Sequence, residues 1–129
     1  MELQRNMVTW FEIPVNDLER AISFYETVFD VKLDRYTIGP AKIAAFPRTA
    51  NIPGAPGALV NSPNFGSPSA DSTLLYFDAK SGDLQNELSK VTAAGGKILQ
   101  GKTFLTEENG YMAVLIDTEG NRIGMHSFK

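Results

Sequence analysis

The stretch that decides the fold is residues 7–29, MVTWFEIPVNDLERAISFYETVF, because residues 72–94, STLLYFDAKSGDLQNELSKVTAA, are a diverged repeat of it. Each copy has an alternating apolar strand, then polar helix-opening residues, then apolar residues at helical spacing. Aligning Leu18 with Leu84 gives a repeat of about 65 residues, longer than the roughly 20–50 residues of solenoid repeats. The sequence therefore predicts two βαβββ modules that share one sheet.

The first predicted strand has two different faces, because side chains alternate along a strand. One face carries Phe11, Ile13 and Val15 and leads directly into the helix, so we expect it to pack in the core. The other face carries Trp10 and Glu12. These two side chains are then expected to point toward the opposite, concave side of the sheet.

Both predicted helices have clear boundaries. The first opens at a capping box, with Asn16 as the N-cap and Glu19 three residues later, and continues to Phe29. The second covers residues 83–94 and is ended by Gly95-Gly96. The apolar stripes, which we expect in the core, comprise Leu18, Ala21, Ile22, Tyr25, Val28 and Phe29 in the first helix and Leu84, Leu88 and Val91 in the second.

Short strands are predicted to complete each module. They cover residues 32–38, 42–47 and 57–61 in the first module and 97–105, 111–116 and 122–128 in the second. Residues 62–70, rich in Pro and Gly, are the predicted connector. Asp117, Glu119 and Asn121 are expected to serve the tight turn before the last strand. The prediction is a single α+β domain of two pseudo-repeats, at about residues 5–62 and 71–129.

Composition narrows the class of protein. The chain has 129 residues, enough for one domain, and 43% of them are hydrophobic and 21% charged, as in ordinary globular proteins. The net charge is −3 and no basic patch suggests nucleic acid. Cysteine is absent, which excludes disulfides and thiolate chemistry. The N-terminus lacks the apolar core of a signal peptide, and no apolar run suits a membrane span, so we expect a cytoplasmic protein.

Five segments carry a resemblance to a known family. In the first module they are residues 11–21 (FEIPVNDLERA), 24–25 (FY) and 28–29 (VF), and in the second they are 94–97 (AGGK) and 117–123 (DTEGNRI). These segments resemble the vicinal oxygen chelate superfamily, which includes glyoxalase I, bleomycin resistance proteins and extradiol dioxygenases. Taken together, and in this order, the segments match the family over essentially the whole chain. The resemblance implies a curved eight-stranded mixed sheet around a pocket, and a homodimer. The sequence is more similar to the lactoylglutathione lyase-related subgroup, for which the resemblance implies a fold and no reaction.

The same resemblance bears on the family's divalent metal, which inward-facing His, Glu or Gln side chains hold while leaving positions open for the substrate. The corresponding positions here are Trp10, Ser72, Gly124 and a position near Val60. None of these residue types is a plausible ligand. We therefore expect no metal and no other cofactor, and the chemistry of glyoxalase I and of extradiol dioxygenases is excluded because it depends on that metal.

Two residues remain as catalytic candidates. Glu12 interrupts an apolar strand on the concave face, and His126, the only histidine, lies two residues beyond Gly124 on the same face. Together they would make a general base oriented by a carboxylate near neutral pH. In a second interpretation Glu12 binds the backbone or Arg122, and His126 is a partly exposed strand-end residue. In a third, the two side chains hold a divalent ion weakly.

The concave face is otherwise apolar. Its expected lining residues are Trp10, Phe46, Ser72, Leu74, Tyr76, Tyr111, Gly124 and Phe128. Such walls suit a small, partly apolar organic ligand, although the same aromatic side chains could fill a narrow groove or a dimer seam. Two functions stay open, an enzyme of the lyase or isomerase type acting on a small oxygenated substrate, and a non-catalytic protein that binds or sequesters a drug or metabolite. An unpaired module edge also predicts a homodimer, with modules pairing either within or between chains.

Overall fold

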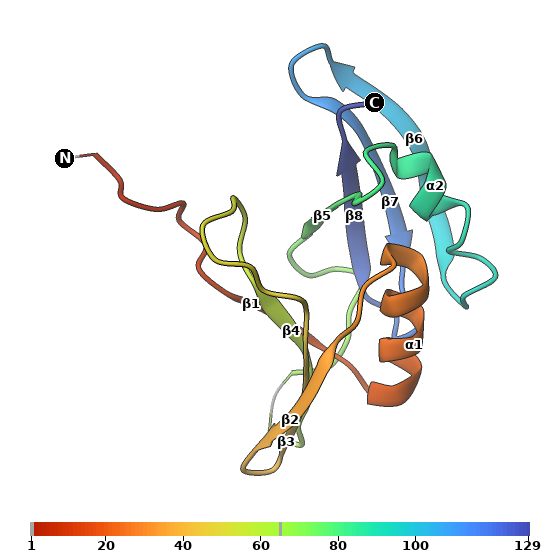
Figure 1. Ribbon diagram of the computed structural model, residues 1–129. Helices are drawn as coiled ribbons and strands as arrows, with labels where there is room; N and C mark the ends of the chain where they lie inside the picture. The colour runs from red at the N-terminus through yellow and green to blue at the C-terminus, as the bar shows by residue number, and fades with distance from the viewer. Residues whose placement is uncertain (1, 65) are drawn as a thin grey trace.

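The computed structural model of the chain describes residues 2–64 and 66–129 and contains two modules of the same topology (Figure 1). Module one consists of β1 (Phe11–Pro14), α1 (Leu18–Phe29), β2 (Asp34–Ile38), β3 (Ala41–Ala45) and β4 (Gly57–Asn61). Module two consists of β5 (Tyr76–Asp78), α2 (Leu84–Leu88), β6 (Lys97–Thr106), β7 (Gly110–Ile116) and β8 (Arg122–Ser127). The α+β class and the two βαβββ modules are confirmed.

The eight strands are divided between two sheets of four. The sheets have the orders β1-β4-β3-β2 and β5-β8-β7-β6, so each places its first and last strands side by side. Those two strands run parallel, and the other neighbours run antiparallel. A parallel pair requires a long crossover, which α1 provides in module one. The strands β1 and β5 form the inner edges at which the two modules approach each other.

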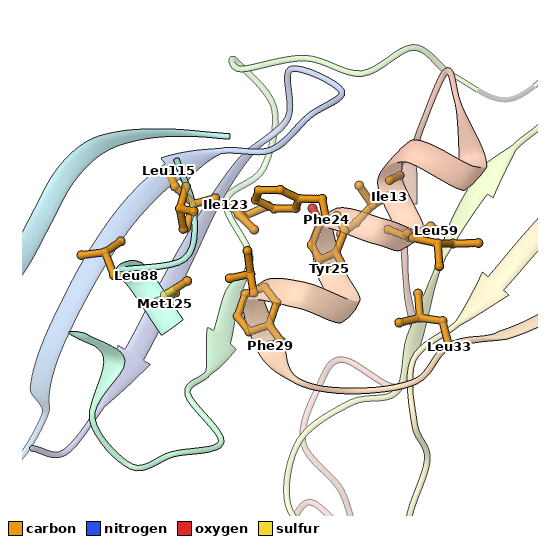
Figure 2. Close-up of a cluster of buried hydrophobic side chains, with 14 of the residues drawn as sticks. Ile13, Phe24, Tyr25, Phe29, Leu33, Leu59, Leu88, Leu115, Ile123 and Met125 are labelled. Atoms are coloured by element: carbon orange, nitrogen blue, oxygen red, sulfur yellow. The ribbon is translucent and has the colours of Figure 1, made fainter. Parts of the chain in front are cut away.

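One hydrophobic core joins the two modules. Figure 2 shows Phe24, Tyr25 and Phe29 of α1 between Ile13 and Leu59 of the first sheet on one side and side chains of the second module on the other. The predicted apolar stripes of both helices are confirmed, except that Leu18 is only partly buried. Because side chains of α1 pack against both sheets, the two modules of this chain share one core.

Several elements are shorter than predicted, and β1, β5 and α2 are shortened most. The strands β1 and β5 begin at Phe11 and Tyr76, because the parallel pairing with β4 and β8 covers four and three residues. The helix α2 ends at Leu88, and the chain continues in turns whose bonds span three residues, such as Val91 N–H to the Leu88 carbonyl. Phe65, inside the predicted connector, lies outside the described residues. No helix in the described part of the chain is long and apolar enough to cross a bilayer.

The predicted capping box at α1 is wrong. The N-cap is Asp17, whose carboxylate accepts a hydrogen bond from the backbone N–H of Arg20 at 3.0 Å. Glu19 turns away and pairs with Arg35 at 2.7 Å. The reason is long-range, because the backbone N–H of Asn16 donates instead to Glu119 of module two at 2.9 Å.

The turn before β8 binds the two modules together through three buried side chains, Asp117, Glu119 and Asn121, which we call the intermodule latch. Glu119 Oε1 accepts hydrogen bonds from the backbone N–H groups of Asn16 at 2.9 Å and Asp17 at 2.8 Å. Its other oxygen accepts from Arg20 Nε at 2.7 Å. Glu119 thus satisfies free N–H groups at the start of α1 and favours its positive dipole end.

The other two residues of the intermodule latch, Asp117 and Asn121, also form hydrogen bonds with module one. The Tyr25 hydroxyl donates to Asp117 Oδ2 at 2.6 Å, and Asn121 Nδ2 donates to the Pro14 carbonyl at 2.9 Å. Burial, and then the negative charge of Asp117, raise the pKa of Tyr25 well above its ordinary value, so the phenol stays a donor. Asp117 also accepts local turn bonds. The predicted turn chemistry is therefore only part of what these residues do.

The homodimer stays a prediction. The strands β2 and β6 are the outer edges of the two sheets, and each has one hydrogen-bonded neighbour among the described residues. Phe104 and Leu105 of β6 are exposed. An unpaired edge with exposed apolar side chains is the feature that a second copy would cover.

We expect Glu119→Gln to lower the free energy of unfolding by about 2–3 kcal/mol, because the amide replaces an ionised acceptor that receives charged and backbone hydrogen bonds. Urea denaturation measures this loss as a lower midpoint at unchanged slope. Glu107→Gln is the matched control, since Glu107 is exposed in the loop between β6 and β7. Equal stability of the two variants would contradict the structural role of Glu119.

The latch also predicts an acid sensitivity. Burial acts to raise the pKa of Glu119, but hydrogen bonds from Arg20 and from backbone N–H groups outweigh it and hold the pKa below the ordinary 4.5. A pKa that is lower in the folded chain adds stability that is present above the unfolded pKa and lost as the pH falls through the folded one. As the pH falls below the ordinary carboxyl pKa of 4.5, the wild type should therefore lose more stability than Glu119→Gln. Parallel losses in urea titrations would rule this out.

Candidate functional site

A groove of about 360 Å³ runs along the seam between the modules. We call it the intermodule groove. Residues of β1 form one wall, and the segment before β5 together with the start of β8 forms the other. Its lining residues are Phe11, Glu12, Ile13, Pro14, Ser67, Ser72, Thr73, Leu75, Asn121, Arg122 and Ile123. The groove therefore combines an apolar body with a few polar side chains, as small-molecule sites do.

A larger depression of about 990 Å³ lies on the outer surface beside α1. Its lining includes Glu19, Arg35 and Lys80. These charges are already used within the chain, because Arg35 pairs with Glu19 at 2.7 Å and Lys80 with Asp30 at 3.4 Å. Charges that neutralise one another on an open surface offer a ligand little, so the intermodule groove is the better candidate.

Glu12 lies in the groove but is not buried. Its Oε2 accepts a hydrogen bond from Trp10 Nε1 at 3.2 Å, and both side chains are solvent-exposed. The predicted faces of the first strand are correct, since Ile13 and Val15 are buried while Glu12 points away from the core. In the described part of the chain, Glu12 forms no ion pair with Arg122.

His126 is half-buried on β8, in the second sheet, and has its own partners. Its Nε2 is hydrogen-bonded to the Asn109 carbonyl, and its ring meets the Phe128 ring edge-on, with centroids 4.7 Å apart. Among the described residues, no hydrogen bond joins His126 to Glu12. The general base that would require both residues stays a hypothesis without a contact to support it.

Tyr76 and Gly124 lie opposite each other in the parallel pair β5–β8. A Cβ added to Gly124 would stand 2.6 Å from the Tyr76 ring, so the ring occupies the space above the glycine. Tyr76 is 52% exposed on its outer side. Both residues share the face of His126, because side chains alternate along a strand. The Tyr76 ring thus occupies the space on the sheet surface that a side chain at position 124 would otherwise fill.

The remaining predicted lining residues are divided among three places. Ser72 lines the groove, and Leu74 is half-buried just before β5. Phe46 is partly buried and packs against the core, with its ring centroid 5.5 Å from that of Tyr25. Tyr111 also lies on the core side, opposite buried Ser127, because strand alternation places it on the face away from His126.

The residues at the family's metal positions do not fit a divalent cation. Val60 is a buried aliphatic side chain, Gly124 has no side chain and lies under Tyr76, and the Trp10 indole is a donor that is already bonded to Glu12. Ser72 offers only a neutral hydroxyl. Across residues 2–64 and 66–129, no group of three or more His, Asp or Glu side chains is arranged to hold an ion. We derive no step through a metal.

Nine of the eleven groove residues are not predicted from the sequence to bind a ligand, and Phe11, Asn121 and Arg122 are three of them. The sequence pattern predicts Phe11 in the core, Asn121 in a turn, and Arg122 only as a possible partner of Glu12. A signal for Arg122 was present, because strand alternation places it on the same face as Gly124 and His126. What the sequence did not contain was the approach of β1 to that face.

We expect Gly124→Ala to cost about 1–2 kcal/mol of stability, because the new methyl group meets the Tyr76 ring. In a Tyr76→Ala background the same substitution should cost much less. Chemical denaturation of both single variants and the double variant gives the coupling between the two positions. Additive losses would mean that the ring does not occupy the space above residue 124.

Comparison with solved structures finds the same fold. A mutant of glyoxalase I from Zea mays superposes with a TM-score of 0.72 at 22% identity, covering 93% of this chain and 45% of that chain. This chain thus spans about half the length of the maize protein. A glyoxylase/bleomycin resistance protein/dioxygenase domain from Frankia sp. EAN1pec gives a TM-score of 0.71 at 18% identity, with 95% and 97% of the two chains covered.

An antibiotic binding protein from Streptomyces sp. CB03234 is similar over 98% of both chains, with a TM-score of 0.65 and 22% identity. No curated protein matches the sequence. The model of the Glyoxalase/Bleomycin resistance protein/Dioxygenase superfamily matches residues 7–125, nearly the whole chain. With two βαβββ modules and this match, the chain belongs to the Glyoxalase/Bleomycin resistance protein/Dioxygenase superfamily.

Proposed function

We propose that this chain is a small-molecule binding protein that holds a partly apolar organic ligand in the intermodule groove. The observation that carries the proposal is the groove itself, which both modules build and which places Glu12, Ser72 and Arg122 around an apolar body. Its volume of about 360 Å³ falls within the roughly 300–1,000 Å³ of small-molecule sites.

The composition of the walls supports the same proposal. Phe11, Ile13, Leu75 and Ile123 supply apolar surface, which favours binding because it is removed from water when the ligand enters. The walls are also well supported. Ile13 and Ile123 are members of the common core, and Phe11 and Leu75 pack against it, so the lining is largely formed before a ligand arrives.

A similar protein adds a second line of support. The Streptomyces neighbour is described as an antibiotic binding protein and matches this chain along its full length. At 22% identity the likeness establishes the fold alone, so the ligand of that protein is not carried over. It supports the proposal only in that a single chain of this size and topology can have ligand binding as its function.

Binding without turnover is favoured over catalysis because the groove lacks a pair of groups that could exchange a proton. Glu12 of β1 is hydrogen-bonded to Trp10, whereas His126 of β8, in the second sheet, is hydrogen-bonded to Asn109 in the turn between β6 and β7. The acid–base alternative, a lyase- or isomerase-type reaction, requires Glu12 and His126 to act on one substrate. A general base has to lie within hydrogen-bonding reach of the proton it removes.

The test is to fill the groove. Thr73 is exposed and lines the groove, so Thr73→Trp should occupy it, whereas Thr92→Trp adds the same side chain at an exposed position outside it. A panel of small aromatic alcohols and carboxylic acids is titrated by NMR against the wild type and both variants. We expect binding to the wild type and to Thr92→Trp, with shifts in residues 11–14 and 121–123, and a loss of about tenfold or more in Thr73→Trp.

Two results would contradict the proposal. One is that no member of the panel changes the spectrum of the wild type. The other is that the ligands which bind do so equally well to Thr73→Trp, because binding would then lie outside the intermodule groove. A ligand at about 100 times its dissociation constant should also add about 2.7 kcal/mol of stability, which a thermal shift detects independently.

A further inference from the structure

Arg122 stands apart from the other polar residues of the intermodule groove because folding leaves its guanidinium incompletely bonded. Its Nη2 donates to the Ser72 carbonyl across a long 3.5 Å, and its Nε is buried with no hydrogen-bond partner. In the described part of the chain no carboxylate lies within 4.0 Å of it. A buried donor without an acceptor costs free energy, about 1–3 kcal/mol in typical cases.

The neighbours of Arg122 do not share this feature. Asn121, the preceding residue, uses its amide fully, since it donates to Pro14 and Asp117 and accepts from the Ser69 N–H. Arg20 and Arg35 each pair with a carboxylate at 2.7 Å. Among the described residues, the one buried side-chain nitrogen or oxygen without a hydrogen-bond partner is therefore Nε of the half-buried Arg122, at the first position of β8.

The shape of the group determines which ligand it can recognise. A guanidinium is planar, stays charged, and presents its N–H groups in a fixed fork that matches the two oxygens of a carboxylate. The apolar side chains Phe11, Leu75 and Ile123 line the same groove. A ligand with an apolar body and a carboxylate at one end therefore satisfies both parts of the groove together.

Glu12 restricts the ligand further. It lines the groove from the other module and carries a negative charge without a basic partner in the described part of the chain. A second anionic group on the ligand would meet this like charge, which is unfavourable. The groove should therefore prefer a molecule with one carboxylate to a molecule with two.

We infer that the ligand of the intermodule groove is a small apolar monocarboxylic acid whose carboxylate is bound by Arg122. The inference rests on the proposed function, because it names the chemical class of the molecule that the same groove holds. Arg122 is a specificity-determining residue in this account. It anchors the acid, while the apolar walls hold the rest of the molecule.

The experiment compares two probes with the same body, 3-phenylpropanoate and 3-phenylpropanol, titrated by NMR at low salt. For the wild type we expect the acid to bind about tenfold or more tightly than the alcohol, the contribution of one charge-assisted hydrogen bond. Arg122→Gln should remove this preference while leaving the binding of the alcohol nearly unchanged. Arg122→Lys should keep part of it, because the charge remains and the fork is lost.

The two groove charges should act in opposite directions. Glu12→Gln removes the like charge and should strengthen the binding of 3-phenylpropanoate by a few-fold, without an effect on the alcohol. Arg48→Gln is the matched control for Arg122→Gln, since it also removes one positive charge, but from an exposed loop position that does not line the groove. Amide spectra that match the wild type verify that each variant is folded.

Each outcome separates this inference from the proposed function. If both probes bind the wild type equally, the groove binds small molecules and the carboxylate inference is overturned. The same holds if the preference for the acid survives in Arg122→Gln or is lost equally in Arg48→Gln. If neither probe binds at the groove while another member of the panel does, the carboxylate inference fails and the proposed function stands; if no member of the panel binds there, both fail.

Discussion

A carboxylate that is removed from water must be matched by donors, and in this chain the donors for Glu119 lie in the other module. Arg20 and the backbone N–H groups of Asn16 and Asp17 surround it. Because the two sheets share no hydrogen-bonded strand pair among the described residues, this contact and the common core determine how the modules are oriented. Asn121 and Arg122, which follow Glu119 after Gly120, line the intermodule groove. The position of the groove wall is thus a consequence of how one buried charge is satisfied.

The candidate site is distinguished by polar groups that the folded chain does not fully hydrogen-bond internally. Most buried polar groups near the seam are used internally, and Asn121 is a clear example, with both its amide nitrogen and its oxygen bonded. The guanidinium of Arg122 is not used to the same degree. On the other wall Glu12 keeps its charge exposed. A site whose polar groups are few and incompletely satisfied can bind a ligand through them without first breaking an internal bond.

Much of the fold could be predicted because its signals are local. The repeat, the helix stripes and the two faces of β1 all follow from periodicity within about ten residues. What failed depended on distant partners. The capping box at Asn16 and Glu19 was a sound local pattern that lost to a carboxylate about a hundred residues away. Phe46 is predicted to line the pocket, and the structure shows its partly buried ring packed against the core, a contact with Tyr25 that no local pattern indicates. The groove could not be foreseen because no local pattern brings β1 beside Arg122.

The intermodule groove also shows what a duplicated chain gains over two identical halves. Module one contributes a negative side chain and module two a positive one. A symmetric pair of identical modules presents the same surface twice, so like charges would face each other across the two-fold axis. Divergence of the two copies removes that symmetry. The groove consequently has a polarity from one end to the other, and an asymmetric molecule inside it has one preferred direction.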